Sequence, residues 1–411
     1  MASTAGSVRP VLTGLRPTPA RRWAAAAIML ALAGHALVLA VWPAAHTLLI
    51  DLQVYAAGGE HVLHGRPLYA GGVLLTLPFV YPPFAALLFV PLSLLPVGVL
   101  KAVWTALTLL LLGYVVHRSR PGPLLATVAF VALATWLDPV RTTLYLGQIN
   151  VLVMALVVGD LLGRRESRWR GVGIGLAAAL KLTPLLFVAY LLVTRRFRAA
   201  ATALGTFVAA AGLGFLVDPD DSAVYWLRGT FAAADRISDV AGASNHSLNG
   251  LVARVAGPAA TPVYVAGAVL LVAVTLVLAA RAHRVGEEVL AVTLCGLCSA
   301  AVAPFSWSHH WVWVVPLVVA LGWRAVEGAR AAAWLLAGVL VPTVAVVTAL
   351  PGAGVGPIPS TGLISLLPDA YLLLFMAVLV VAAAVLYRPR HDEGPAGPAG
   401  PSSTCGWGVS R

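Results

Sequence analysis

Residues 23–43 read WAAAAIMLALAGHALVLAVWP, and this uninterrupted apolar segment directly follows Arg21 and Arg22. A helix of about 20 apolar residues crosses the hydrocarbon core of a bilayer. No clear small-residue cleavage site follows the segment, so the sequence predicts a retained membrane helix and not a secretory signal peptide.

Similar segments recur to the end of the chain. Of the 411 residues, 60% are apolar and only 10% are charged, whereas a soluble domain has about 25% charged residues. This composition predicts an all-α fold, a polytopic helix bundle in a membrane. We expect one membrane domain over residues 21–390, with disordered cytoplasmic segments at residues 1–20 and 391–411.

The basic residues predict the orientation of the helices. The formal net charge of +11 does not indicate nucleic acid, because the arginines lie in short clusters between apolar segments, which is the positive-inside pattern. These clusters occupy residues 16–22, 118–120, 164–170, 195–198, 281–284, 324–330 and 388–390. We expect the clusters and both termini on the cytoplasmic side of the plasma membrane, beside anionic lipids.

This orientation predicts the path of the chain. Outward crossings are expected at residues 23–43, 121–137, 199–217, 288–304 and 331–349, and returns at residues 147–163, 263–280, 311–323 and 370–387. Residues 44–77, 138–150, 218–262 and 305–310 would then lie on the external side.

Two segments do not fit simple crossings. Residues 171–194 have basic clusters at both ends but are too short for two full spans, so we expect a short hairpin that bends at residues 181–184, where Pro184 breaks the helix. Residues 81–116 predict a short or re-entrant piece up to Pro96, followed by a full helix. The total is expected to be about twelve membrane helices, within a range of about ten to thirteen.

The expected external side contains the unusual polar residues. Asp51 follows the first apolar segment, in a loop rich in aromatic residues and turn formers. An ionisable group at membrane depth indicates function, and the alternative is a solvated loop aspartate. Lys181 lies at the expected bend, where it needs either a mechanistic role or contact with water. The other candidates are Tyr55, Tyr81, Gln148, Asn150, Asn245, His246, Asn249, Arg254, Ser306, Trp307, His309 and His310. Such basic and aromatic groups suit a ligand with a lipid tail, a phosphate and a sugar.

Three other motifs favour structural interpretations. Trp307, Trp311 and Trp313 are typical of anchors at the membrane interface. The D-x-D within residues 218–221 occurs as a metal motif in some nucleotide-sugar enzymes, but a turn or helix cap is the favoured interpretation. The C-x-x-C that begins at Cys295 favours packing, because no second pair or nearby histidine suggests zinc.

No metal is expected at His309 and His310 either. Adjacent histidines at a helix start point to different faces, and no acidic ligand is close in the sequence. For the same reason we expect only one of the two to face a site, and we favour His309.

The motifs, taken in order, resemble glycosyltransferase family 87. They are D-x-x-V-Y from Asp51, H-G-x-P-L-Y from His64, Y-P-P-F from Tyr81, G-Q-I-N from Gly147, G-x-x-x-A-x-K-L-x-P from Gly175, N-H-S-L-N-G from Asn245 and S-W-S-H-H-W from Ser306. The resemblance covers residues 23–390, and the ordered set is more specific than any single motif. One departure is Asn-His-Ser at residues 245–247, where the family is expected to have Asn-Gln-Ser.

The resemblance implies a C-type glycosyltransferase fold with external loop helices. The family includes polyprenol-phosphate-mannose-dependent α-(1,2)-mannosyltransferases, which take a sugar from a polyprenyl phosphate on the external face and invert its anomeric centre. It implies a lipid or glycan acceptor and no metal or nucleotide cofactor. Asp51 matches the single carboxylate that acts as general base.

The chemistry suggests roles for the other candidates. The departing lipid phosphate needs cations already in place, and Lys181, Arg254 and His309 or His310 are candidates for them. Sugar or acceptor contacts are expected from Tyr55, Tyr81, Gln148, Asn150, Asn245, His246, Asn249, Ser306 and Trp307. We expect a monomer.

Two other classes of protein remain as alternatives. A transporter or flippase for a polyprenyl sugar would also explain the bundle and the lysine, and a non-catalytic scaffold for envelope assembly would not need Asp51. Within the enzyme interpretation, the sequence does not distinguish mannose from arabinose or glucose.

Overall fold

The computed structural model describes residues 19–43, 47–163, 167–233, 236–257, 260–345 and 368–388. The first helix begins at Pro19, so the expected disordered N-terminal segment lies outside these ranges except for its last two residues. Residues 391–411 lie wholly outside them.

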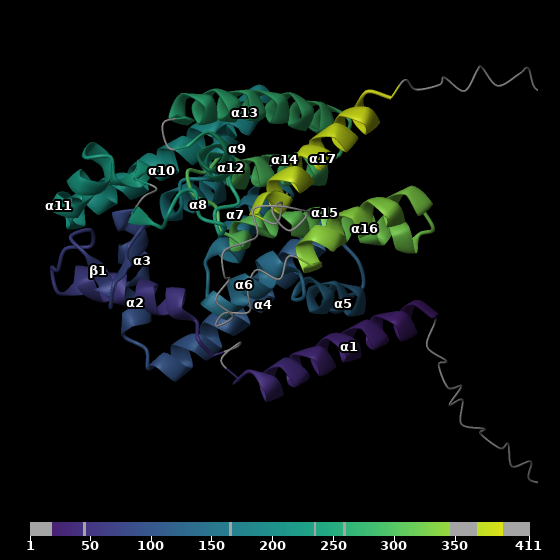
Figure 1. Ribbon diagram of the computed structural model, residues 1–411, viewed down its shortest axis with the longest axis horizontal. Helices are drawn as coiled ribbons and strands as arrows, with labels where there is room; N and C mark the ends of the chain where they lie inside the picture. The colour runs from purple at the N-terminus through teal and green to yellow at the C-terminus, as the bar shows by residue number, and fades with distance from the viewer. Residues whose placement is uncertain are drawn as a thin grey trace, which may run out of the picture.

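Helices form almost all of the regular structure (Figure 1). They are α1 Pro19–Val41, α2 Ile50–Leu63, α3 Pro83–Ser93, α4 Val97–Ser119, α5 Leu124–Ala134, α6 Asp138–Leu146, α7 Asn150–Leu161, α8 Val172–Leu180, α9 Leu185–Val193, α10 Phe197–Val217, α11 Pro219–Ser222, the π-helix η2 Ala223–Leu227, the 3-10 helix η3 Thr230–Ala232, α12 Leu248–Ala256, α13 Thr261–Arg284, α14 Glu288–Ala301, the 3-10 helix η6 Ser308–Trp313, α15 Val314–Val326, α16 Arg330–Ala345 and α17 Ala370–Leu386. The strands β1 Gly72–Leu74 and β2 Leu77–Pro78 form one antiparallel hairpin. The all-α prediction is confirmed.

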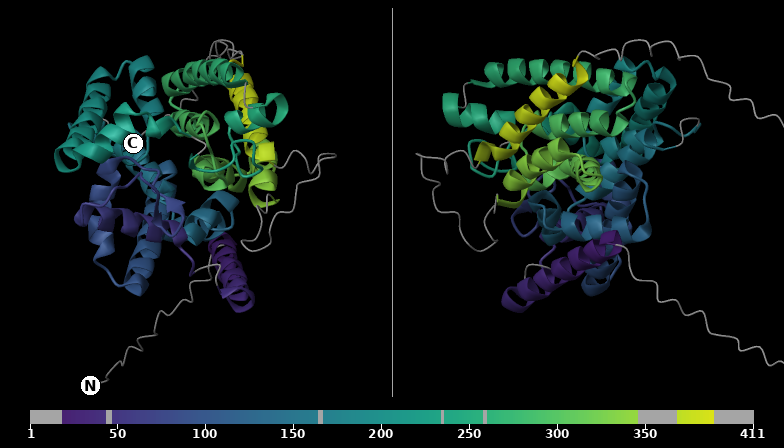
Figure 2. Two further views of the ribbon diagram at one scale, coloured as in Figure 1. Left: turned by 60° about the vertical axis from the view of Figure 1, so that its left-hand side comes forward. Right: turned by 90° about the vertical axis from the view of Figure 1, so that its right-hand side faces the viewer.

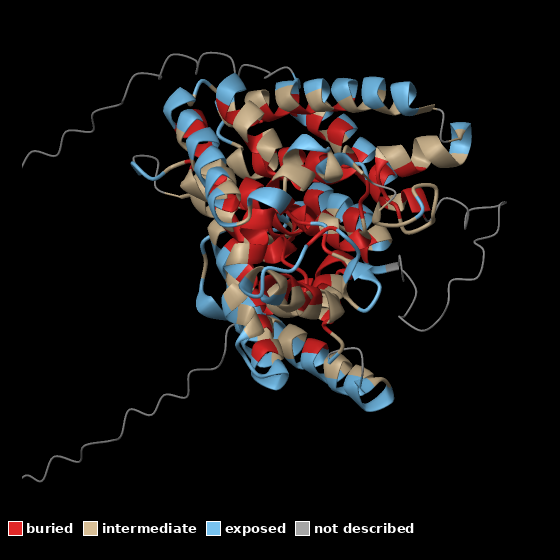
Figure 3. Ribbon diagram, turned by 90° about the vertical axis from the view of Figure 1, so that its left-hand side faces the viewer, coloured by how far each residue is buried: buried red, intermediate tan, exposed pale blue. Residues whose placement is uncertain are grey.

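Four of the described helices, α1, α4, α10 and α13, are long and apolar enough to cross a membrane. The pair α5 and α6, bent by 81°, gives a fifth if it counts as one span. Figures 1 and 2 place α1 and α13 at opposite edges of the bundle, and Figure 3 shows how much of their surface is exposed. Exposed apolar side chains such as Trp23 and Leu270 require lipid around them. The chain is therefore a multi-pass membrane protein, and the larger helix count stays a prediction.

The predicted hairpin is present between residues 171 and 194. The helix stops at Lys181 and resumes at Leu185, directly after Pro184. A Cβ on Gly171 would lie 2.2 Å from the carbonyl oxygen of Ala199 near the start of α10. Farther along α8, Ala179 packs with Ala210, so α8 runs beside α10 in the same direction. Since α9 then returns to the start of α10, the bend forms the far end of the hairpin.

The segment after Tyr81 also folds as predicted, as the short helix α3 and then the full helix α4. The expectation of a loop around Asp51 was wrong, because Asp51 lies in the first turn of α2. Helix α2 packs on α3, where Gly59 lies against the backbone of Phe89. Aromatic residues and turn formers suggested a loop, and packing between the two helices overrides that signal.

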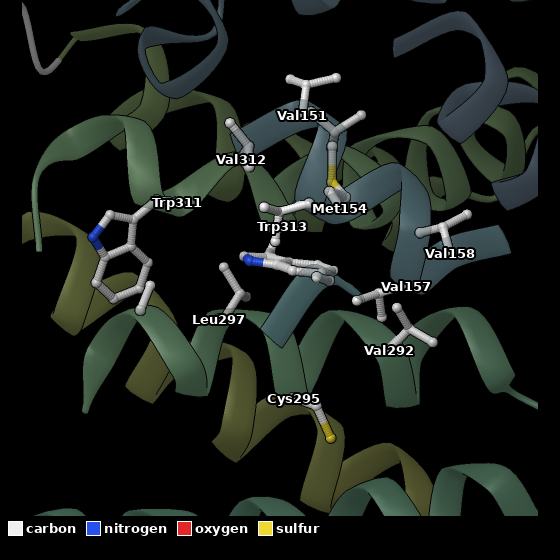
Figure 4. Packing of buried hydrophobic residues seen from close by; sticks show 14 of the residues in the cluster. Val151, Met154, Val157, Val158, Val292, Cys295, Leu297, Trp311, Val312 and Trp313 are labelled. Atoms are coloured by element: carbon white, nitrogen blue, oxygen red, sulfur yellow. The ribbon is translucent and has the colours of Figure 1, made fainter. Parts of the chain in front are cut away.

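The prediction of interface anchors was wrong for Trp311 and Trp313, which are both buried. Trp313 packs against Gly296 of α14, where any Cβ would lie 2.2 Å from the indole. Figure 4 shows the same indole among Met154 of α7 and Leu297 of α14. The chain turns inward along η6 at this point, so the two indoles enter the core and not the membrane interface.

The two remaining structural interpretations are confirmed. Cys295 and Cys298 are free and buried in the packed face of α14. Asp218 caps α11 by accepting the N–H of Asp221, at 3.2 Å. The Asp221 carboxylate accepts the N–H of Leu68 at 2.7 Å, which ties the segment between α2 and β1 to α11.

Candidate active site

A cavity of about 460 Å³ opens between α2, the β-hairpin, the bend after α8, the segment around η3 and the segment that leads into η6. Many of the residues selected from the sequence line it: Asp51, Tyr55, Tyr81, Gln148, Lys181, Trp307, His309 and His310. They come from segments that lie far apart in the chain. The volume suits a small polar group with part of an attached chain.

Gln148 holds Asp51 in a fixed orientation. Its Nε2 donates to Asp51 Oδ2 at 2.5 Å. Its Oε1 accepts from the hydroxyl of Tyr55 at 2.9 Å and from that of Tyr81 at 3.2 Å. The two tyrosines therefore fix which end of the amide faces the carboxylate. Gly147 has φ +74° and lies close against α2, where any Cβ at this position would be 2.7 Å from Cβ of Leu52. The glycine therefore allows Gln148 to approach α2.

Asp51 has the properties of a general base. Burial raises the pKa of its carboxyl from the usual 3.8 to about 6, while the hydrogen bond from Gln148 and the charge of Lys181 act in the opposite direction. Among the described residues, Gln148 is the one hydrogen-bond partner of the carboxylate, and it uses Oδ2. Oδ1 is left to accept a proton. A carboxylate that is ionised at neutral pH but more basic than usual is suited to that role.

Lys181 supplies a cation at the bend after α8. Its Nζ donates to Asn150 Oδ1 at 2.9 Å and lies 2.8 Å from His310 Nε2. It also lies 5.7 Å from the centre of the Tyr81 ring. None of the ion pairs found in the described part of the chain includes Lys181. Its positive charge is therefore available to an anionic ligand in the cavity.

Both histidines face the cavity, although only one was expected to do so. A 3-10 helix has about three residues per turn, and the cavity extends around the start of η6. The rings of His309 and His310 lie 4.8 Å apart at 84°. His310, and not the favoured His309, contacts Lys181. Both ring nitrogens of His309 are buried and have no hydrogen-bond partner among the described residues.

Three of the other candidates, Asn245, Asn249 and Ser306, do not line the cavity. Asn245 Oδ1 accepts the backbone N–H of Ser306 at 3.0 Å. Asn249 Nδ2 donates to the carbonyl oxygen of Pro304, also at 3.0 Å. The two asparagine side chains hold the backbone of the segment that leads to His309. The buried Oγ of Ser306 has no hydrogen-bond partner among the described residues.

Arg254 and His246 are also engaged elsewhere. Arg254 Nη2 forms an ion pair with Asp369 at 2.5 Å, and its Nη1 donates to two backbone carbonyls. His246 Nδ1 donates to the carbonyl oxygen of Pro368 at 2.8 Å. The two side chains join the segment before α12 to the start of α17. Arg254 is therefore not brought to the cavity as a phosphate ligand.

One cation that lines the cavity was given no role from the sequence. Arg236 follows η3, and its Nη2 donates to the carbonyl oxygen of Tyr69 at 3.1 Å. No motif surrounds it in the sequence. A signal was available, because an arginine in an expected external segment departs from the positive-inside pattern.

Comparison with known proteins identifies the family. The profile of glycosyltransferase family 87 matches residues 79–304. The chain is 40% identical over 324 residues to a polyprenol-phosphate-mannose-dependent alpha-(1-2)-phosphatidylinositol mannoside mannosyltransferase of Mycobacterium tuberculosis, covering 71% of this chain and 76% of that protein. It is 35% identical to the protein of the same name in Mycolicibacterium smegmatis, over 66% of this chain and 69% of that protein.

A third relative is the polyprenol-phosphate-mannose-dependent alpha-(1-2)-phosphatidylinositol pentamannoside mannosyltransferase of Mycobacterium tuberculosis. It is 35% identical to this chain, with 77% of each protein covered. No solved structure matches the chain. The relatives are enzymes, which disfavours the transporter and scaffold alternatives. The profile match and the 40% identity show that the chain belongs to glycosyltransferase family 87.

Proposed function

We propose that this protein transfers a mannosyl group from a polyprenyl phosphate to a hydroxyl of a mannosylated phosphatidylinositol acceptor, with inversion, on the external face of the membrane. The donor and acceptor classes come from the names of its relatives. The observation that carries the proposal is the cavity itself, which combines a fixed carboxylate at Asp51 with the unpaired cation Lys181.

In this reaction Asp51 removes the proton from the acceptor hydroxyl. The acceptor oxygen forms a bond to the anomeric carbon while the bond from that carbon to the phosphate oxygen breaks, and the polyprenyl phosphate departs with the electron pair. Lys181, with His310 beside it, stabilises the charge that grows on the phosphate. Gln148 keeps the carboxylate aimed, and Tyr55 and Tyr81 keep Gln148 in place.

The proposal includes no nucleotide and no metal cofactor. We expect transfer from radiolabelled polyprenyl-phosphate mannose by the purified protein, no transfer from a nucleotide sugar, and full activity in a chelator. Direct use of the nucleotide sugar, or complete inhibition by the chelator, would contradict the proposal.

About twelve crossings, cytoplasmic termini and an external cavity are proposed from the arginine clusters. A monomer is part of the proposal as well. Contacts at the helix ends support this topology. Arg196, before α10, pairs with Glu288 at the start of α14, at 2.8 Å. Arg281, at the end of α13, donates to the carbonyl oxygen of Leu386 at the end of α17. These basic clusters therefore meet at one side of the bundle, whereas the bend at Lys181 is at the other end of the α8–α9 hairpin.

Thiol labelling in intact cells tests this topology. A cysteine at Leu75, which is 87% exposed beside the cavity, should react with an impermeant maleimide. A cysteine at the exposed Arg168 should react only after the membrane is permeabilised. Both variants carry Cys405→Ser, and the buried Cys295 and Cys298 remain. Labelling of Arg168→Cys in intact cells would reverse the proposed orientation.

A further inference from the structure

Arg236 is a second cation in the cavity, and the mechanism above does not use it. It is half-buried. Its guanidinium lies 5.8 Å from the centre of the Tyr69 ring and donates a hydrogen bond to the backbone carbonyl oxygen of Tyr69. The ion pairs of the described residues do not include it. The nearby carboxylate of Asp221 accepts the N–H of Leu68 instead. Part of the guanidinium is therefore free to bind an anion.

Arg236 and Lys181 contact opposite ends of a row of aromatic rings. Lys181 lies on Tyr81, whose ring is 5.9 Å from that of Phe79, and Phe79 is 6.3 Å from Tyr69, which carries Arg236. The charge that acts on Asp51 is that of Lys181. Arg236 is not among the charges that act on Asp51, so the two cations have different neighbours in the cavity, and the mechanism above uses only Lys181.

The wall near Arg236 is apolar and open. Phe231 lines the cavity and is 47% exposed. Its ring packs on Tyr225, whose own ring lies 5.5 Å from that of Tyr69, the residue that Arg236 contacts. Leu75, at the tip of the β-hairpin, is 87% exposed at φ +53°, a turn conformation that favours glycine or asparagine. Apolar side chains at such positions suit contact with lipid. Arg236 therefore lines a cavity whose wall combines exposed apolar side chains with the polar group around Asp51.

We propose that Arg236 binds the phosphodiester of the acceptor lipid, and so selects an anionic glycophospholipid over a neutral glycoside. In such a lipid the phosphodiester lies between the sugar headgroup and the acyl chains. The headgroup would enter toward Asp51 while the acyl chains stay at the exposed apolar side chains, which puts the phosphate beside the guanidinium. This inference rests on the proposed function and assigns the selection of the acceptor to a particular residue.

The test compares two acceptors in purified protein with polyprenyl-phosphate mannose as donor. One is a mannosylated phosphatidylinositol, and the other is an uncharged alkyl α-mannoside. Arg236→Gln should lower kcat/KM for the charged acceptor by about tenfold to a hundredfold, the value of a hydrogen bond to a charged group. The preference for the charged over the neutral acceptor should fall by a similar factor, and the KM for donor should change little.

Arg228→Gln is the matched control, because Arg228 lies in the same external segment but is exposed and does not line the cavity. It should keep the wild-type preference, and Arg236→Lys should restore part of it. If Arg236→Gln lowered kcat/KM by the same factor with both acceptors, or raised the KM for donor instead, the acceptor subsite would be overturned. Failure of the wild type to use polyprenyl-phosphate mannose at all would refute the proposed function instead.

Discussion

Asp51→Asn should lower turnover by at least about a hundredfold, the lower range for a positioned general base. The amide has the shape of the carboxylate but cannot take the proton of the acceptor hydroxyl. Donor binding should be largely retained, because the donor phosphate is assigned to Lys181 and not to Asp51. Steady-state kinetics with radiolabelled polyprenyl-phosphate mannose measures both effects.

The pH profile separates loss of a base from loss of structure. Burial raises the pKa of Asp51 to about 6, and the base acts only when ionised, so wild-type kcat/KM should fall as the pH drops below that value. Burial also lowers the pKa of Lys181 to about 7, so kcat/KM should fall again at higher pH as this cation loses its proton. The residual activity of Asp51→Asn should lack the acidic step. Glu60→Gln is the control, because Glu60 lies on the same helix but pairs with Arg66 at the exposed surface. Turnover near that of the wild type in Asp51→Asn would refute the assignment.

The fold could be predicted where local chemistry decides it. Pro184 ends one helix of the hairpin, and Pro96 precedes α4, so both breaks were visible in the sequence. Apolar length alone predicted α1, α10 and α13 within a few residues. Burial of Trp313 could not be predicted, because it depends on Gly296 of another helix, and tryptophan suits a core as well as an interface.

In the site, too, unusual residues could be selected from the sequence, whereas their contacts with distant segments could not be predicted. Asp51, Gln148 and Lys181 could be selected because an ionisable or amide group in a strongly apolar chain is unusual wherever it lies. Arg254 and Arg236 show which information the sequence does not contain. Arg254 is neutralised by Asp369, which lies 115 positions away, whereas Arg236 has no such partner among the described residues. Only contacts between distant segments distinguish a structural arginine from one that is free to bind.

Lys181→Met should lower turnover by about a hundredfold to a thousandfold, the range for removing a group that stabilises developing negative charge. Methionine keeps most of the aliphatic stem and deletes the charge. Negative charge grows on the donor phosphate as its bond to the sugar breaks, so the charge of Lys181 matters more in the transition state than in the bound donor. The KM for donor should therefore change less than kcat does.

The substitution also removes partners from Asn150 and His310, so folding must be checked by yield from the membrane and by thermal unfolding in detergent. Lys101→Met is the matched control: Lys101 is the other lysine of the chain, and its Nζ donates to the carbonyl oxygen of Thr47, away from the cavity. That variant should retain turnover. His310→Ala should lower kcat more than His309→Ala does, because His310 is the ring in contact with Lys181. Wild-type kcat and donor KM in folded Lys181→Met would show that the phosphate departs without this cation, and the leaving-group role would then have to pass to another side chain of the cavity.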